Sequence, residues 1–314
     1  MEVQTARIRE TVPDVALCVL LSGGIRAAPL SIASGQSVLD LSVSPDATVG
    51  GAWIRTIARI SLPGQPQKIM IVHGGPTPAP SLTDAEGVSI LRDEDEFRGP
   101  AGAVRDAAGD QPDDSYVLVI EAASYMQRTM DAVFASLTSR QADVVVAINA
   151  DRSPAGVYLI RRRVIDLIPV IGFMDLKEQF LSLADQAGYE IVVCDLGPRA
   201  TSRIRTRSDL LEASALACRR NGTNGRACHA IVSRSVYGVH CVCPGASVAD
   251  DAMILDSIIM PGARVGSGAV VARSVLFRDA VVDAGESVVE RCVSRIGLFT
   301  DSDIESRRGG ESWR

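Results

Sequence analysis

A glycine-rich turn after an apolar run is the first group of residues that could do chemistry. Val15 to Leu21 is almost wholly apolar, Ser22, Gly23 and Gly24 follow it, and Arg26 comes two residues later. Glycine lets backbone N–H groups approach a phosphate closely, and arginine adds a fixed positive charge. The segment could therefore bind phosphate. The two glycines could equally make a plain tight turn between a strand and a helix.

Charged residues beside later apolar runs are the next candidates. Glu121 ends DSYVLVIE and Asp195 ends YEIVVCD, so either carboxylate could lie at the carboxyl edge of a sheet and hold a cation. Lys177 in MDLKEQF and Arg203 in TSRIRTR are basic residues of the same part of the chain. For Lys177 we favour a solvated helix face, because charged side chains are mostly exposed.

A sheet must bring these strand ends together. Five apolar runs are typical of buried strands: ALCVLL, QKIMIVHGG, DSYVLVIEA, ADVVVAINA and YEIVVCDL. Segments of helical period lie between them, including YMQRTMDAVFASLTSR and MDLKEQFLSLADQAG, and Ser208 to Arg220 predicts a further helix. Strands that alternate with helices predict right-handed βαβ units, and hence an α/β fold with a mostly parallel sheet. Its ligands would bind at the carboxyl ends of the strands.

Composition narrows the class of protein. The 314-residue chain has a net charge of −6 with scattered basic residues, so we do not expect nucleic acid as a partner. It begins MEVQTARIRE and has no apolar stretch of membrane-spanning length, so we expect a cytoplasmic protein that has no membrane partner. Its seven cysteines lack C-x-x-C spacing and are expected to be reduced and mostly buried.

The C-terminal part repeats. Five pairs place Ala two positions before an aliphatic residue, at Ala246, Ala252, Ala263, Ala269 and Ala280. The first two are six residues apart, as are the next two. CPGASV recurs as MPGARV, and DSII as RSVL, each 17 residues later. Sides of about six residues, three to a turn, predict a triangular parallel β-helix with one shortened corner.

These patterns divide the chain into three parts. We expect an α/β domain over residues 1–220, a β-helix over 221–299, and a mobile polar tail over 300–314. The segment NGTNG after residue 220 is a plausible hinge.

The α/β part resembles the nucleoside-diphosphate-sugar pyrophosphorylases, the sugar-phosphate nucleotidyltransferase family that includes mannose-1-phosphate guanylyltransferase. The resemblance runs from about Val15 to Val293 and rests on LSGG with R-x-x-PL, on GPAGAVR, and on the β-helix behind them. It implies a Rossmann-like GT-A-type sheet followed by a short left-handed β-helix. It also implies nucleotide contacts for the turn residues and for the GPAG loop. These residues are Ser22, Gly23, Gly24, Gly99, Ala101 and Gly102. The GPAG segment could alternatively just start a helix, with proline in its first turn.

The resemblance also shows where the chemistry of the family is missing. The family's motif lysine falls at Gln36, and its two metal-binding aspartates fall at Ala123 and Arg203. Its lysine-bearing hairpin before the strand that matches Gly156 to Leu159 is absent, so Gly156, Lys177 and Arg203 are the sugar-phosphate candidates. We predict no metal site. If the chain did bind a metal ion, Glu121 and Asp195 would be the weak candidates for its ligands. If each lost contact contributed about 3 kcal/mol, losing three would slow turnover roughly a million-fold.

We therefore expect a diverged relative that binds a nucleotide or nucleotide sugar and has weak or lost catalysis. Its role would be regulatory, and linked to polysaccharide synthesis. It would assemble with itself or with an active relative through the β-helix. The first alternative is an active nucleotidyltransferase, in which Arg26 contacts phosphate and Mg²⁺ is the cofactor; otherwise no cofactor is expected. The second is a β-helix acyltransferase with His229 or His240 as the catalytic histidine.

Overall fold

The structure is a computed structural model, and it describes residues 14–23, 28–59, 68–74, 78–82, 86–93, 98–127, 142–221 and 240–306. Gly24, Arg26 and His229 lie outside these residues, as does the predicted NGTNG hinge except for its first residue, Asn221. So does most of the predicted helix YMQRTMDAVFASLTSR. Its first residues, Tyr125 and Met126, are in a strand rather than a helix.

A seven-stranded sheet organises the α/β region, in the order β10-β8-β9-β6-β1-β4-β5. Only β9 runs antiparallel to its neighbours, so the predicted mostly parallel sheet is confirmed. All five strands expected from the apolar runs are present. The strands of this sheet are β1 (Val15–Leu21), β4 (Lys68–Gly74), β5 (Val88–Asp93), β6 (Tyr116–Glu121), β8 (Val144–Ile148), β9 (Pro154–Arg161) and β10 (Ile191–Asp195).

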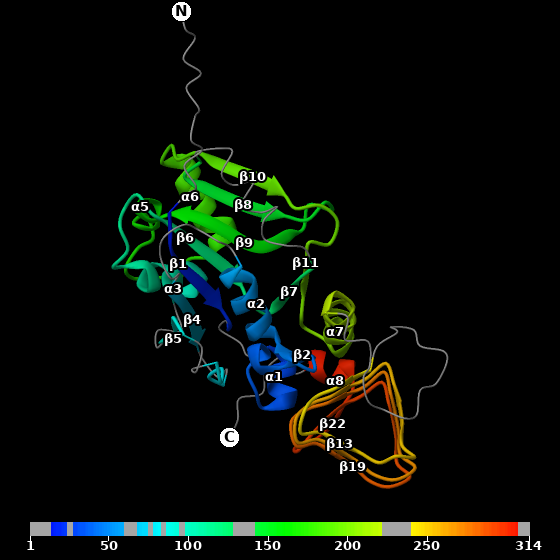
Figure 1. The fold of residues 1–314 in the computed structure, drawn as a ribbon. Coiled ribbons are helices and arrows are strands. Elements are labelled where there is room, and N and C mark those ends of the chain that lie inside the picture. The colour runs from blue at the N-terminus through cyan, green and yellow to red at the C-terminus, as the bar shows by residue number, and fades with distance from the viewer. Residues whose placement is uncertain are drawn as a thin grey trace, which may run out of the picture.

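Helices cover both faces of this sheet (Figure 1). Alternate residues of β1 enter two different apolar clusters: Cys18 and Leu20 one, Leu17 and Val19 the other. Trp53 of α2 packs in the first cluster, and Val104 of α3 packs in the second. The helical elements here are α1 (Pro29–Ser34), η1 (Val38–Asp40), α2 (Val49–Ala58), α3 (Gly99–Ala108), α5 (Arg162–Ile165), the π-helical turn η2 (Leu176–Phe180), α6 (Leu181–Gln186) and α7 (Arg207–Asn221).

Two short antiparallel pairs accompany the sheet. β2 (Ser42–Ser44) pairs with β3 (Ala47–Thr48), and β7 (Ser124–Met126) pairs with β11 (Thr201–Arg203). The Trp53 indole N–H donates to the carbonyl of Ser124 at 2.7 Å, so α2 is tied to β7 immediately beyond the end of β6. The β7–β11 pair thus fixes chain segments next to the carboxyl edge of the sheet.

The C-terminal region is a stack of short parallel strands with a triangular outline (Figure 1). Partners in three small sheets lie 17 residues apart, such as Ile258 with Val275 and Ile254 with Val271. The predicted 17-residue repeat is confirmed, and the arrangement is compatible with a parallel β-helix. The strands are β12 (Cys241–Val242), β13 (Ser247–Val248), β14 (Met253–Leu255), β15 (Ile258–Ile259), β16 (Arg264–Val265), β17 (Val270–Ala272), β18 (Val275–Leu276), β19 (Val281–Val282), β20 (Ser287–Val289) and β21 (Cys292–Ser294), with an antiparallel end strand, β22 (Gly297–Phe299).

The Ala-x-aliphatic pairs point into this stack. Ala263 and Val265 are buried in its core, together with Ala269 and Val271 one side further on. One corner of each coil has a left-handed backbone at Asp256, Arg273 and Glu290, spaced by 17. A serine ladder follows it, because Ser274 N donates to the Ser257 hydroxyl at 3.1 Å and Arg291 N donates likewise to that of Ser274.

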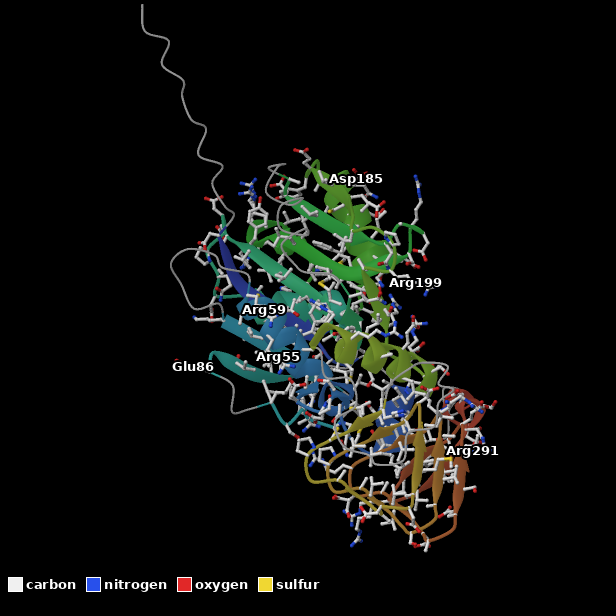
Figure 2. The ribbon with its side chains drawn as sticks, turned by 45° about the vertical axis from the view of Figure 1, so that its right-hand side comes forward. Arg55, Arg59, Glu86, Asp185, Arg199 and Arg291 are labelled. Atoms are coloured by element: carbon white, nitrogen blue, oxygen red, sulfur yellow. The ribbon has the colours of Figure 1, made fainter. Side chains whose placement is uncertain are left out.

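The stack and the sheet region lie end to end and share apolar core. Asp185, near the far end of the sheet region, and Arg291, on the stack, mark the two ends in Figure 2. Phe277 of the stack belongs to the same cluster as Trp53 of α2. Residues 301–306 of the predicted tail form α8 (Asp301–Ser306). The Asp301 carboxylate forms an ion pair with Arg207 at 2.9 Å.

Among the described residues no cysteine forms a disulfide, and every described cysteine is buried, as predicted. None of the described helices has the length and apolar character needed to cross a membrane.

Candidate functional site

A cavity of about 530 Å³ lies at the carboxyl ends of β1, β4 and β6, where ligands of a parallel sheet are expected. The β1 turn supplies Ser22 and Gly23, and the start of α3 supplies Gly99 and Pro100. Further wall comes from the first residues of β9, from η2 and from β11. The cavity therefore gathers segments from almost the whole α/β region.

The β1 turn is closed by hydrogen bonds. The backbone N–H and the hydroxyl of Ser22 both donate to the carbonyl of Val72, at 2.9 and 3.2 Å. Ser22 is buried, and Gly23 faces the cavity beside it. Gln36, where the resemblance places the motif lysine, is not among the residues that line the cavity.

Glu121 is the centre of a charged cluster in this cavity. Lys177 Nζ lies 2.7 Å from Glu121 Oε1, and Arg203 Nη2 lies 3.0 Å from Glu121 Oε2. The Tyr158 hydroxyl donates to Glu121 Oε1 at 3.2 Å. Burial first, and then the Glu121 carboxylate, raise the pKa of Tyr158 above its usual value, so its hydroxyl stays protonated. We call Glu121, Lys177 and Arg203 the ionic cluster.

Three separate elements position the ionic cluster. Glu121 ends β6, a strand held between β1 and β9. Lys177 lies in the first turn of η2, where the Asp175 carboxylate accepts from Lys177 N at 2.6 Å and caps the turn. Arg203 ends β11, opposite Ser124 of β7. Lys177 is thus ion-paired inside a cavity, and the expected solvated helix face is wrong for it.

Two candidate glycines have steric reasons to be glycine. Gly156 has φ of +69°, and a Cβ there would lie 3.0 Å from Glu121 Cβ. Gly99 has φ of +70°, and a Cβ there would lie 2.7 Å from the Met174 carbonyl oxygen. Both line the cavity. Any side chain at Gly156 would press on the ionic cluster.

Three other candidates lie away from the cavity wall. Ala101 and Gly102 are buried within α3, and Gly102 faces the side chain of Arg98. The GPAG segment does start a helix, and only its first two residues reach the cavity. Asp195 ends β10, the outermost strand on the side away from β1, and its carboxylate accepts from Gly197 N at 2.7 Å.

The two positions aligned with metal-binding aspartates both line the cavity and are neighbours. Ala123 lies between β6 and β7, and its carbonyl accepts from the N–H of Ile204, the residue after Arg203, at 2.9 Å. Their side chains are a methyl group and a cation. In the described part of the chain, no three His, Cys, Asp or Glu side chains are grouped so that they could hold a metal ion.

Sequence reasoning missed Tyr158 and Asp175. Tyr158 was taken only as part of a buried strand, although its hydroxyl needed a partner once its ring was buried. Asp175 precedes a helical segment, which is the position of an N-cap, and this signal could have placed Lys177 in the first turn. Arg205 also lines the cavity, two residues beyond Arg203, at which β11 ends.

Comparison with known proteins leaves the family open. No protein-family model matches the chain, and no curated protein matches it. One similar solved structure is a provisionally assigned glucose-1-phosphate thymidylyltransferase from Bacillus anthracis in complex with sucrose; it is 15% identical, with 64% of this chain and 94% of that chain covered and a TM-score of 0.49. Another is a homologue, from Mycobacterium sp. strain JC1, of Mycobacterium tuberculosis rv0371c, with 17% identity, 65% and 97% covered and a TM-score of 0.45. These values do not establish a family for the chain.

Proposed function

We propose that the cavity binds a nucleotide or nucleotide sugar, and that the chain is a diverged sugar-phosphate nucleotidyltransferase-like protein with weak or lost catalysis. The observation that carries this proposal is the ionic cluster. Lys177 and Arg203 put two fixed positive charges into a cavity large enough for a small ligand. Cations of this kind form strong charge-assisted hydrogen bonds with phosphate.

Other parts of the cavity suit the same ligand. Gly23 lines the cavity at the end of β1 and has no side chain to keep a ligand from its backbone. The N-terminal end of α3, a ten-residue helix, reaches the cavity with Gly99 and Pro100. Pro100 has no N–H and Ala101 N donates to the Met174 carbonyl at 3.2 Å, so this end favours an anion mainly through the helix dipole. Together with the sequence resemblance, this favours a phosphate-bearing ligand whose base and sugar contact the apolar wall.

The residues present do not fit the magnesium site of that family. Mg²⁺ needs several hard oxygen ligands. Among the described residues, three carboxylates line the cavity: Glu121 is already shared by two cations, Asp175 caps η2, and Asp93 ends β5. Ala123 offers no ligand, and Arg203 would repel a metal ion. We therefore derive no metal-assisted step, and infer that nucleotidyl transfer is weak or lost.

The active-enzyme alternative would need Glu121 or Asp195 as a metal ligand. Asp195 lies on β10 and does not line the cavity, while Glu121 is ion-paired. The alternative is tested by a pyrophosphate-release assay with four nucleoside triphosphates and several sugar 1-phosphates. Turnover that is abolished by Arg26→Ala would establish it and would overturn the proposal of lost catalysis.

The acyltransferase alternative has less support. His240 Nδ1 accepts a hydrogen bond from Asp256 N at 3.1 Å, and burial lowers the pKa of this histidine. Because Asp256 belongs to the backbone corner of the stack, His240 serves the local fold. Acetyl-CoA binding would revive the alternative.

We further propose that the stack is a left-handed parallel β-helix and that it mediates assembly with a second copy or an active relative. Partly exposed apolar side chains on its outer faces, Met253, Val281 and Val289, support this role. Light scattering coupled to size exclusion tests self-assembly. A monomer at all concentrations would rule out a stable homo-oligomer.

Binding itself is tested by isothermal titration with nucleoside diphosphates and nucleoside diphosphate sugars of each base. We expect at least one ligand to bind the wild-type chain. We also expect binding to weaken by tenfold or more in Lys177→Met. Absence of binding by every ligand, with and without Mg²⁺, would reject the proposed function.

A further inference from the structure

The ionic cluster is a carboxylate held by two cations where the sequence resemblance places a metal site. Its three charged groups come from β6, η2 and β11, and each is between 29% and 40% exposed in its side chain. The cluster therefore faces the cavity and is open to a ligand. One oxygen of the Glu121 carboxylate contacts Lys177 and the other contacts Arg203, so Glu121 pairs with both cations at once.

Several features show that the carboxylate is built into this position. Tyr158 donates to Glu121 Oε1, and its raised pKa keeps the hydroxyl a donor. Gly156 leaves the space that the Glu121 side chain occupies, because a Cβ there would lie 3.0 Å from Glu121 Cβ. Ala123, the first position aligned with a metal-binding aspartate, has no polar group to compete for the cations.

The geometry of the carboxylate resembles that of a phosphate contact. A carboxylate that bridges an ammonium and a guanidinium presents two anionic oxygens, as a phosphate group does. Removing Glu121 from the pair would leave two cations side by side in a half-open cavity, which is unfavourable unless another anion takes its place. A diphosphate carries more charge than one carboxylate and can contact both cations.

We propose that Glu121 is an internal anion that occupies the phosphate subsite, and that the diphosphate of a nucleotide sugar displaces it from Lys177 and Arg203 without a divalent cation. The internal-anion proposal rests on the proposed function. It adds that the diphosphate is the group recognised and that Glu121 opposes its binding. The two cations take the place of the metal. Glu121 lowers the affinity for the ligand, and it keeps the cations in place when no ligand is bound.

Titration with inorganic pyrophosphate and with the four nucleoside diphosphate glucoses, in EDTA and then in MgCl₂, tests the proposal. We expect the wild-type chain to bind in EDTA and added Mg²⁺ to tighten binding less than threefold. Glu121→Gln, which removes the competing charge but keeps the shape, should bind about tenfold more tightly. Lys177→Met and Arg203→Met should each bind at least tenfold more weakly.

Glu290→Gln is the matched control. Glu290 forms an ion pair with Arg273 at 2.7 Å on the stack, so the variant loses the same charge far from the cavity. Its affinity should equal that of the wild type. The midpoint of thermal unfolding, measured for every variant, identifies a variant that fails to fold. The EDTA and MgCl₂ titrations of the wild type test binding without a divalent cation and need no variant.

The outcomes separate the two proposals. Binding that requires Mg²⁺, or that weakens in Glu121→Gln, overturns the internal-anion proposal and leaves the binding function standing. Binding in EDTA with a tighter Glu121→Gln supports both. If no probe binds either the wild type or Glu121→Gln in any condition, both proposals are rejected.

Discussion

The cavity and the stack build their structure in opposite ways. In the cavity, side chains from distant segments meet through charge, as with Arg203 and Glu121, which are 82 residues apart. In the stack, the strand pairing repeats every 17 residues, and the apolar cluster enclosed by the coils is aliphatic. Charges that stay partly exposed contribute little to stability, whereas buried aliphatic groups contribute much. The comparison therefore predicts that stability and ligand binding respond to different residues.

The largest effect should come from the core that joins the stack to the sheet region. Phe277 is fully buried and shares a cluster with Trp53, so Phe277→Ala should lower the free energy of unfolding by about 3–5 kcal/mol. Urea unfolding followed by Trp53 fluorescence should report this loss, with the second tryptophan removed by Trp313→Phe. Trp53 lies in α2, outside the stack, so it reports on the sheet region. Val281→Ala, on the exposed face of β19, should change it by less than about 0.5 kcal/mol. An unchanged Trp53 midpoint in Phe277→Ala would mean that the two regions unfold independently.

The next effect concerns the ion pair that attaches α8 to α7. The Arg207 side chain is only 9% exposed, and it also donates to the carbonyl of Arg273. Asp301→Asn removes the countercharge and should lower the free energy of unfolding by about 2 kcal/mol, between the values for exposed and buried pairs. Urea denaturation measures it. Glu290→Gln, which breaks the more exposed pair with Arg273, should leave the free energy of unfolding nearly unchanged. Equal losses in the two variants would contradict the ranking by burial.

The sequence predicts the stack better than the cavity, for a physical reason. Repeats that pack against their own neighbours leave a period in the sequence, so Ala263-x-Val265 and Ala280-x-Val282 predict their own stacking. The ends of the sheet strands were predictable in the same way from apolar runs. Which strand lies beside which was not predictable, and Asp195, on the outermost strand β10, could not be separated from Glu121.

The partners of Lys177 could not be predicted from local pattern. Its helical segment looks like any charged surface helix, and only the fold brings it within 2.7 Å of Glu121. Alignment on the family motifs assigned Ala123 and Arg203 to the two metal-ligand positions. In the structure they lie near one another, because Ala123 and Arg203 adjoin the pair of β7 and β11. The alignment could therefore predict which positions correspond to the motif. It could not predict what the substituted side chains do there.

The free energy of unfolding should depend on pH through one buried thiol in each region. Burial raises the pKa of Cys18 in β1 and of Cys292 in β21 from 9.0 to about 12. Because the folded pKa is raised, this stability is fully present below pH 9 and is lost as the pH rises toward 12. By pH 10 the free energy of unfolding should fall by about 1 kcal/mol per thiol. Urea titrations from pH 8 to 10 should show a smaller fall in Cys18→Ala. An identical fall in both proteins would assign the loss to other groups.

The smallest change in stability should come from the ionic cluster itself. Glu121 and Lys177 are each about 30% exposed in their side chains, so their attraction is screened and offset by lost hydration. Glu121→Gln and Lys177→Met should each change the free energy of unfolding by under about 1 kcal/mol in urea, less than Asp301→Asn. A loss above about 2 kcal/mol in both variants would make the cluster a structural device. A small loss beside a large change in pyrophosphate affinity is the outcome expected of groups that hold a ligand.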